Sequence, residues 1–311
     1  MLIDQYMQSL NTRTRSQETL RAYRQDLERF EAFLVVSQMG LTNIRLSTIT
    51  AYIAYLNAKR IETSGSGLAP ATVGRRLAVV SEYYEWLQAD SDDPIPNPVK
   101  MVKRPRVRNV DIRSVEDDQL EVLVTGITSR RDKAIVLLFI YSGFRLSELR
   151  SLDKTSITAR RVQLSEGNFE YFGEGQVVGK GGKQRPFRVG PKALSAVGSY
   201  IAVDRAADHN PALFLSSRKE RLSCRAIQHI VNTWCKKLGL AHIHPHQLRH
   251  SFATRSINGG MSSSVLQELM GHASLSTTQR YFHMKGERIS REYYSVMEYV
   301  RLTSSFDQSG C

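Results

Sequence analysis

Cysteine is scarce in this 311-residue chain, which has only three, all far apart. The spacing of Cys224, Cys235 and Cys311 matches neither a zinc site nor a disulfide framework, so we expect reduced, unpaired thiols. The sequence also lacks an internal repeat and any apolar run near the ~20 residues that cross a bilayer. Its first five residues show no signal-peptide pattern. These absences predict a cytoplasmic protein with no membrane partner.

Acidic residues are outnumbered by basic ones. There are 30 Asp and Glu against 43 Lys and Arg, which gives a net charge of +13. Hydrophobic residues make up 41% of the chain, enough to build a core, and the length suggests two domains. Because a strongly basic protein favours a polyanionic partner and no membrane span is visible, we expect double-stranded DNA as the partner.

The first hundred residues predict a helical domain. Apolar residues recur at helical spacing over 17–36, and Pro70 stands where it can open another helix. That second stretch carries the adjacent basic residues Arg75 and Arg76. We therefore expect residues 1–100 to form a small all-α bundle in which Arg75 and Arg76 contact DNA.

A basic linker is expected between the domains. Three closely spaced prolines between residues 93 and 98 exclude a helix, because each restricts its neighbours and lacks an N–H donor. An extended stretch at 101–113 follows, with the cations Lys103, Arg104 and Arg106. We expect this strap to contact a phosphate backbone; the alternative is a solvated linker without a role.

Residues 114–311 predict a second domain that is mostly helical with a small antiparallel sheet. The expected strands are 161–164, 176–179 and 185–189, and the glycine-rich segment 179–183 joins the last two as a hairpin turn. The periodic segments predict helices over 115–124, 132–141, 191–206, 223–238, 246–257, 262–270, 276–282 and 289–299. The fold class is thus mainly α with a small antiparallel β-sheet.

Two arginines in this domain are placed to bind an anion. Arg145 stands at or near the start of a helix, where backbone N–H groups favour negative charge, and Glu148 three residues later could orient it. Arg249 follows His246 by one helical turn, so both side chains can reach the same point. A guanidinium donates two parallel hydrogen bonds to phosphate oxygens. Taken singly, either arginine would more often be a surface ion-pair partner.

Further polar residues accompany the arginines. Lys180 lies at the hairpin tip, where it could protonate a leaving 5′-oxygen or contact DNA, and Lys183 and Arg185 are expected to contact the DNA backbone. His272 could donate to a nonbridging phosphate oxygen, while Tyr281 alone would be an ordinary packing residue. The two guanidinium groups and a tyrosine hydroxyl suit attack on a phosphodiester without a metal.

Four nearby histidines, at positions 242, 244, 246 and 250, raise the alternative of a metal site. Pro245 interrupts their regular spacing, and the sequence places no paired cysteine or acidic ligand beside them. The helical His-x-x-x-His pair also lacks the glutamate of the metalloprotease motif. We therefore expect no metal and no cofactor.

Together these residues resemble a known family. Their order and approximate spacing resemble the signature of tyrosine recombinases of the phage-integrase family. The residues that carry this resemblance are Arg145 with Glu148, Lys180, His246-x-x-Arg249, Gly271-His272 and Tyr281. Segments 19–24 and 70–77 resemble that family's core-binding domain. The resemblance spans nearly the whole chain, lacks the arm-binding domain of some phage integrases, and looks closest to the Xer-like subgroup.

The resemblance implies a type IB mechanism. Tyr281 would attack the scissile phosphate and form a 3′-phosphotyrosyl bond, while the two arginines and His272 stabilise the transition state. Lys180 would act as general acid towards the leaving oxygen, and His246 would assist proton transfer or bind phosphate. Because the bond energy is stored in the phosphotyrosine, rejoining needs no ATP.

It also implies an assembly. A homotetramer on two sites, alone or with a sister recombinase or accessory proteins, would exchange strands through a Holliday junction in the nucleoid. Residues 290–300 would dock on the neighbouring protomer; the alternative is packing on their own domain. Integration, excision, and dimer or cointegrate resolution share this active site and differ in target and partners.

Two departures from the family's pattern stand out. The acidic, aromatic segment 164–175 is longer than usual before the lysine hairpin and is expected to contact a partner subunit. Tyr293 and Tyr294 offer hydroxyls that compete with Tyr281. The alternative functions are a type IB topoisomerase or telomere resolvase, and, from another class, a non-catalytic DNA-binding regulator.

Overall fold

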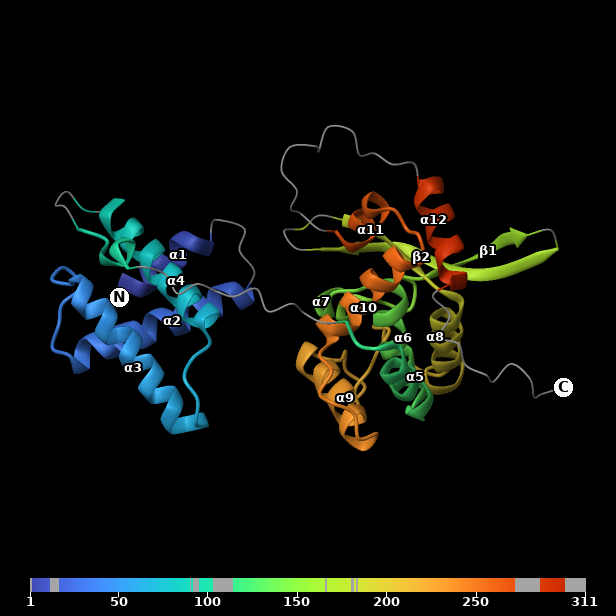
Figure 1. Ribbon diagram of the computed structural model, residues 1–311, viewed down its shortest axis with the longest axis horizontal. Helices are drawn as coiled ribbons and strands as arrows, with labels where there is room; N and C mark the ends of the chain where they lie inside the picture. Colours follow the sequence, from blue (N-terminus) through green and yellow to red (C-terminus); the bar gives the residue numbers. More distant parts are fainter. Residues whose placement is uncertain are drawn as a thin grey trace. The chain divides into compact units, whose positions relative to one another are not determined.

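The computed structural model divides the chain into two compact units, residues 1–110 and 111–311, which we describe separately (Figure 1). None of the described helices is long and apolar enough to cross a membrane. The residues that the structure describes are 2–11, 17–89, 91, 95–102, 114–165, 167–179, 182, 184–271 and 286–299.

The first unit is helical, as expected. Leu20, Leu27, Phe30 and Leu34, which recur at helical spacing in the second helix, are buried against the other helices. The edge of the Phe30 ring packs against Tyr52 at 5.0 Å between centroids, which joins the second helix to the third. The helices of this unit are α1 (Leu2–Asn11), α2 (Gln17–Val36), α3 (Leu46–Ser64), α4 (Pro70–Ala89) and the short 3₁₀ helix η1 (Pro98–Met101).

The second unit surrounds one central helix, α6 (Arg130–Ser142). Nine successive residues of α6, from Ala134 to Ser142, are buried, and the acidic residue Asp132 in its first turn is buried as well. A helix that is apolar all round is buried, and α6 packs against the helices α8 (Pro191–Asp204) and α10 (Pro245–Asn258). The other helices are α5 (Asp117–Gly126), α7 (Leu146–Ser151), α9 (Cys224–Lys237), α11 (Ser263–Met270) and α12 (Gly286–Tyr299).

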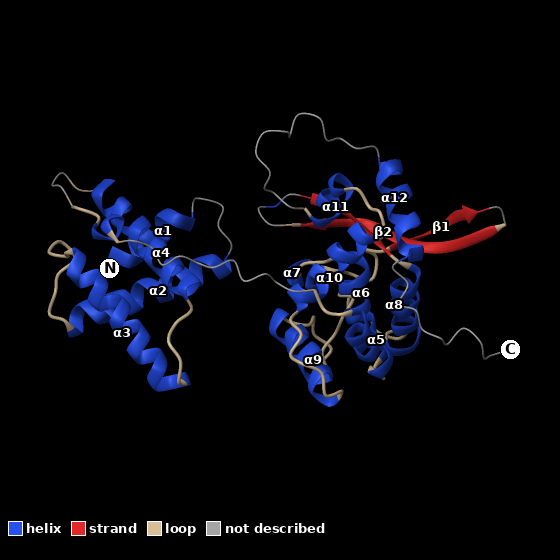
Figure 2. Ribbon diagram, in the orientation of Figure 1, coloured by secondary structure: helices blue, strands red, loops and turns tan. Residues whose placement is uncertain are grey.

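A three-stranded antiparallel sheet lies beside these helices (Figure 2). Its order is β1 (Thr158–Ser165), β2 (Asn168–Val178), β3 (Gln184–Val189). Strand β2 packs on α8, and β3 packs on α11. The expected fold class, mainly α with a small antiparallel sheet, is confirmed.

The segment 164–175 is not an irregular insertion. It lies almost wholly in strands: β1 ends at Ser165, the chain turns at Gly167 with φ 75°, and β2 runs on to Val178. The sequence predicts a strand only at 176–179, because Gly173 and Gly175 within β2 are disfavoured in strands. A Cβ at Gly175 would lie 2.2 Å from the backbone oxygen of Ser156, so glycine is needed here for close packing rather than for a turn.

Candidate active site

Arg145 lies at the N-terminus of α7, directly after a tight exit from α6. The α6 helix is followed by Gly143 as its C-terminal cap, whose φ is 57° and whose absent side chain leaves room for the Phe252 ring. Glu148 then bonds Arg145 twice: one carboxylate oxygen accepts the Arg145 backbone N–H at 2.7 Å, and the other accepts its guanidinium at 2.7 Å. Helix capping and side-chain orientation are thus performed by one carboxylate.

Arg249 reaches the same place from α10. Its side chain is 7% exposed, and one terminal nitrogen lies 3.8 Å from a Glu148 oxygen. It donates hydrogen bonds to the backbone oxygens of Gly143 and, at 2.6 Å, Met270. Arg145 and Arg249, which are about a hundred positions apart in sequence, are therefore both within 4.0 Å of the Glu148 carboxylate.

Arg185, which the sequence predicts to contact DNA, is the third arginine of this cluster and is buried in it. Its side chain is 6% exposed and pairs with Glu148 at 2.5 Å. It also donates to the backbone oxygen of Leu269. A signal for this was present in the sequence: Arg185 alternates with Phe187 and Val189, both fully buried, so the period of a strand points all three inward.

The electrostatics of the cluster favour an anion. Three guanidinium groups surround the carboxylate of Glu148, which leaves an excess of positive charge; Arg185 and Arg249 are buried, whereas Arg145 is 25% exposed. Burial lowers the pKa of Arg249 to about 9, and repulsion by Arg145 and Arg185 adds to this effect. Burial alone would raise the pKa of Glu148, but hydrogen bonds and charge from Arg185 and Arg145 outweigh it and lower the pKa.

Some of the remaining site candidates, such as His246, are described by the structure, and others lie outside its described residues. His246 is exposed on α10, one turn before the buried Arg249, so the two side chains differ in access to water. The residues His242 and His244 bond each other at 3.1 Å. Outside the described residues lie Lys103, Arg104, Arg106, Lys180, Lys183, His272 and Tyr281.

The two tyrosines that compete with Tyr281 are both buried. The Tyr293 hydroxyl donates to the backbone oxygen of Tyr141, and burial, with Tyr141 and Tyr294 nearby, raises its pKa well above the ordinary value. Tyr294 is 8% exposed and packs on Phe172 at 4.3 Å between ring centroids. Neither hydroxyl is placed to attack an external substrate. Their helix, α12, packs on its own unit.

The first unit holds a second carboxylate with several arginines around it. Asp26 is 1% exposed and accepts hydrogen bonds from Arg75 and, at 3.4 Å, from Arg29. Arg76 lies 3.5 Å from the same carboxylate, with a side chain that is 13% exposed, whereas those of Arg29 and Arg75 are about half exposed. The sequence analysis missed Asp26, although it lies one turn before Phe30 on the buried face of α2.

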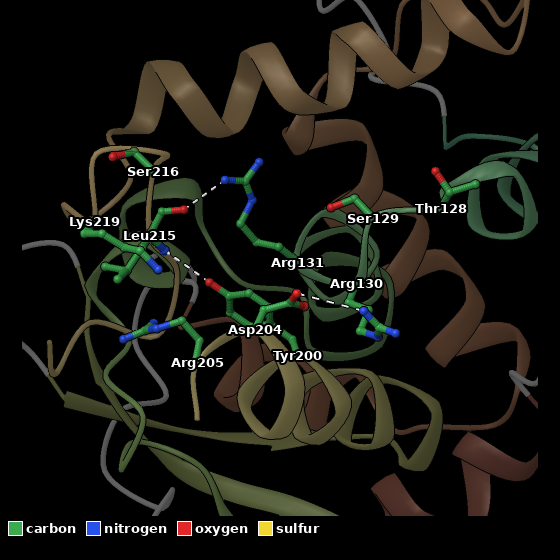
Figure 3. A pocket seen from close by; sticks show the side chains of 10 residues that line it. All are labelled: Thr128, Ser129, Arg130, Arg131, Tyr200, Asp204, Arg205, Leu215, Ser216 and Lys219. Atoms are coloured by element: carbon green, nitrogen blue, oxygen red, sulfur yellow. Dashed lines mark hydrogen bonds and ion pairs between the residues drawn. The ribbon is translucent and has the colours of Figure 1, made fainter. Parts of the chain in front are cut away.

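A separate polar pocket of about 390 Å³ lies where α6 begins and α8 ends (Figure 3). Its cations already have partners within the chain. Arg131 donates to the Leu215 backbone oxygen at 2.9 Å, and Lys219 lies 3.6 Å from Asp208. None of the Arg145, Arg185 and Arg249 side chains lines this pocket, so it is distinct from the arginine cluster.

Both units match known protein families. Residues 113–288 match the phage integrase family, and residues 3–90 match the N-terminal SAM-like domain of phage integrases. Tyrosine recombinase XerC of Herpetosiphon aurantiacus is 32% identical over 282 residues, which cover 87% of this chain and 86% of that protein. The protein of the same name from Chromohalobacter salexigens is 33% identical over 299 residues and covers 94% and 93%.

A solved structure shares the fold. A lambda integrase dimer bound to a COC′ core site superimposes with a TM-score of 0.67 at 17% identity, and covers 88% of this chain and 94% of that one. The chain therefore belongs to the phage integrase family. It is a Xer-like, site-specific tyrosine recombinase, an enzyme that cleaves and rejoins DNA.

Proposed function

We propose that Arg145 and Arg249, in the arginine cluster around Glu148, bind the scissile phosphate during strand exchange between two DNA sites. The observation that carries this proposal is the uncompensated positive charge of Arg145, Arg185 and Arg249 around one buried carboxylate. A phosphodiester there would restore charge balance, and the preorganised donors would stabilise the additional charge of the transition state. Arg145, with a side chain 25% exposed, is the more accessible donor, and Arg249 lies deeper.

In the proposed reaction Tyr281 is the nucleophile. Its phenolic oxygen forms a bond to phosphorus, the bond from phosphorus to the 5′-oxygen breaks, and Lys180 gives a proton to that oxygen. His246 takes up the tyrosine proton or binds phosphate, and His272 supports the transition state. The burial of Tyr293 and Tyr294 supports Tyr281 as nucleophile, since it removes the competing hydroxyls.

The first unit and the basic linker would bind the DNA backbone. Asp26 holds the guanidinium group of Arg75 through both of its terminal nitrogens, and about half of the Arg75 side chain stays exposed to solvent. Arg76, which is more buried, would support this surface from beneath. Lys103, Arg104, Arg106 and Lys183 remain proposed DNA contacts.

We propose a homotetramer on two sites in the cytoplasmic nucleoid, with exchange through a Holliday junction. In the single chain α12 packs on its own unit, with Tyr293 bonded to Tyr141. Docking of residues 290–300 on a neighbour would require this contact to open. A sister recombinase could take one place in the assembly, and the β1–β2 hairpin is a proposed contact between subunits.

The test uses a plasmid that carries two copies of a site selected from random-sequence DNA by binding to the protein. With EDTA present and ATP absent, recombination should give deletion or inversion products, according to the orientation of the sites. Relaxed circles without recombinants would instead support a topoisomerase, and binding without strand cleavage would support a regulator.

A further inference from the structure

Arg185 is joined to Glu148 by a two-pronged contact. Its Nε lies 3.1 Å from one carboxylate oxygen and a terminal nitrogen lies 2.5 Å from the other. Its other terminal nitrogen donates to the backbone oxygens of Leu269 and, at 3.3 Å, Pro186. Four hydrogen bonds to the protein thus occupy this guanidinium, which leaves it poorly placed to bind DNA.

The Leu269 contact belongs to a larger arrangement at the end of α11. Three successive backbone oxygens each accept from a different arginine: Leu269 from Arg185, Met270 from Arg249 and Gly271 from Arg145. The C-terminal end of a helix carries partial negative charge, so three cations stabilise it. The arginines therefore hold the segment from which the chain continues to His272.

Arg185 also packs closely against this turn. Gly271 has φ 58°, and a Cβ added there would lie 2.7 Å from Cδ of Arg185. The guanidinium carbon of Arg185 lies 5.8 Å from the centre of the Phe144 ring, directly before Arg145. The Arg185 side chain thus contacts Glu148, the C-terminal end of α11, and Phe144, which directly precedes Arg145.

We infer that Arg185 is a positioning residue for the phosphate site. Arg185 holds Glu148, and through Glu148 also Arg145, in place relative to the end of α11. This inference rests on the proposed function of the arginine cluster. A flat guanidinium can bond both carboxylate oxygens and the helix end at once, whereas a lysine ammonium offers one point of contact. The identity of residue 185 as arginine is therefore needed, rather than its charge alone.

The experiment measures single-turnover cleavage of a selected duplex with a nick beside the cleavage position, at saturating protein. Arg185→Lys and Arg185→Met should slow cleavage by about 10- to 100-fold, as misplacement of catalytic groups by an ångström does. Duplex affinity and its dependence on salt should stay as in the wild type. The control Arg188→Met changes a neighbouring buried arginine that pairs with Glu174, and should keep the wild-type rate.

A double variant separates positioning from simple loss of folding. Glu148→Gln combined with Arg185→Met leaves no orphaned charge of this pair, and should cleave at about the rate of Glu148→Gln alone if Arg185 acts through Glu148. Circular dichroism and urea unfolding establish which variants are folded. If Arg185→Met fails to fold, Arg185→Lys and the double variant carry the comparison.

Three outcomes would overturn the inference. One is a wild-type rate in Arg185→Lys and Arg185→Met, and another is a double variant whose loss is the product of the two single losses. The third is a variant whose cleavage rate is unchanged but whose duplex affinity depends less on salt, by about one released counterion. That result marks a direct contact between Arg185 and a phosphate. If the wild type itself fails to cleave, the proposed function is wrong, independently of Arg185.

Discussion

Glu148 holds Arg145 by both its backbone and its side chain, with the two hydrogen bonds each 2.7 Å long. The same carboxylate bonds Arg185, so one acidic group holds two of the three arginines in place. In a site built to bind an anion, such a carboxylate lowers the cost of gathering buried positive charge.

Replacement of this carboxylate should be costly. Glu148→Gln leaves buried guanidinium groups without a counter-charge, and we expect it to lower the free energy of unfolding by about 3–5 kcal/mol. Urea unfolding of the second unit, followed by circular dichroism, measures the loss. A change below about 1 kcal/mol would show that the ion pairs hold no more than exposed ones do.

The contribution of Glu148 should also depend on pH. Its pKa in the folded chain is below the ordinary 4.5, so its stabilisation is fully present above that value and is lost as pH falls through the lowered pKa. The difference in unfolding free energy between wild type and Glu148→Gln should therefore be constant near neutrality and shrink in acid. A difference that stays unchanged down to pH 3 would contradict a lowered pKa.

An oxyanion should stabilise the protein through Arg249. Inorganic phosphate, compared with chloride at equal ionic strength, should raise the melting temperature. At a hundred times its dissociation constant, bound phosphate should add about 2.7 kcal/mol to the free energy of unfolding. Arg249→Met should weaken this response. Arg255→Met, on the same helix but paired with Asp117, should retain it. Equal responses in both variants would place the anion elsewhere.

Gly271 should tolerate no side chain. Alanine at this position adds backbone strain at φ 58° and a contact 2.7 Å from Cδ of Arg185, so cleavage should slow as well as stability fall. Gly239→Ala is the matched control, because its φ is 67° and a Cβ there meets nothing within 4 Å. Equal cleavage rates for the two variants, after correction for the folded fraction, would contradict the proposed coupling of this turn to the site.

Much of this architecture could be predicted from the sequence, because local patterns carried it. The apolar spacing of α2 and the glycines around β2–β3 predicted elements that the structure contains, and Gly143 followed by Arg145 predicted a helix start. The alternation of buried residues along β3 also predicts that Arg185 is buried, although its positive charge favours a place on the surface.

The partners within the site could not be predicted in the same way. The bonds from Arg249 to Gly143 and from Arg145 to Gly271 join residues more than a hundred positions apart, and no local pattern encodes such contacts. Asp26 was missed for a related reason: a lone acid on a helix is usually solvated, and its burial depends on arginines that α4 supplies.

The most direct test of the account is the covalent intermediate itself. On the nicked duplex the wild type should accumulate a protein–DNA adduct that survives denaturation, and Tyr281→Phe should abolish it. Tyr294→Phe should keep it, since the Tyr294 hydroxyl is buried without a hydrogen-bond partner among the described residues. An adduct in Tyr281→Phe that equals the wild type's would contradict Tyr281 as the nucleophile.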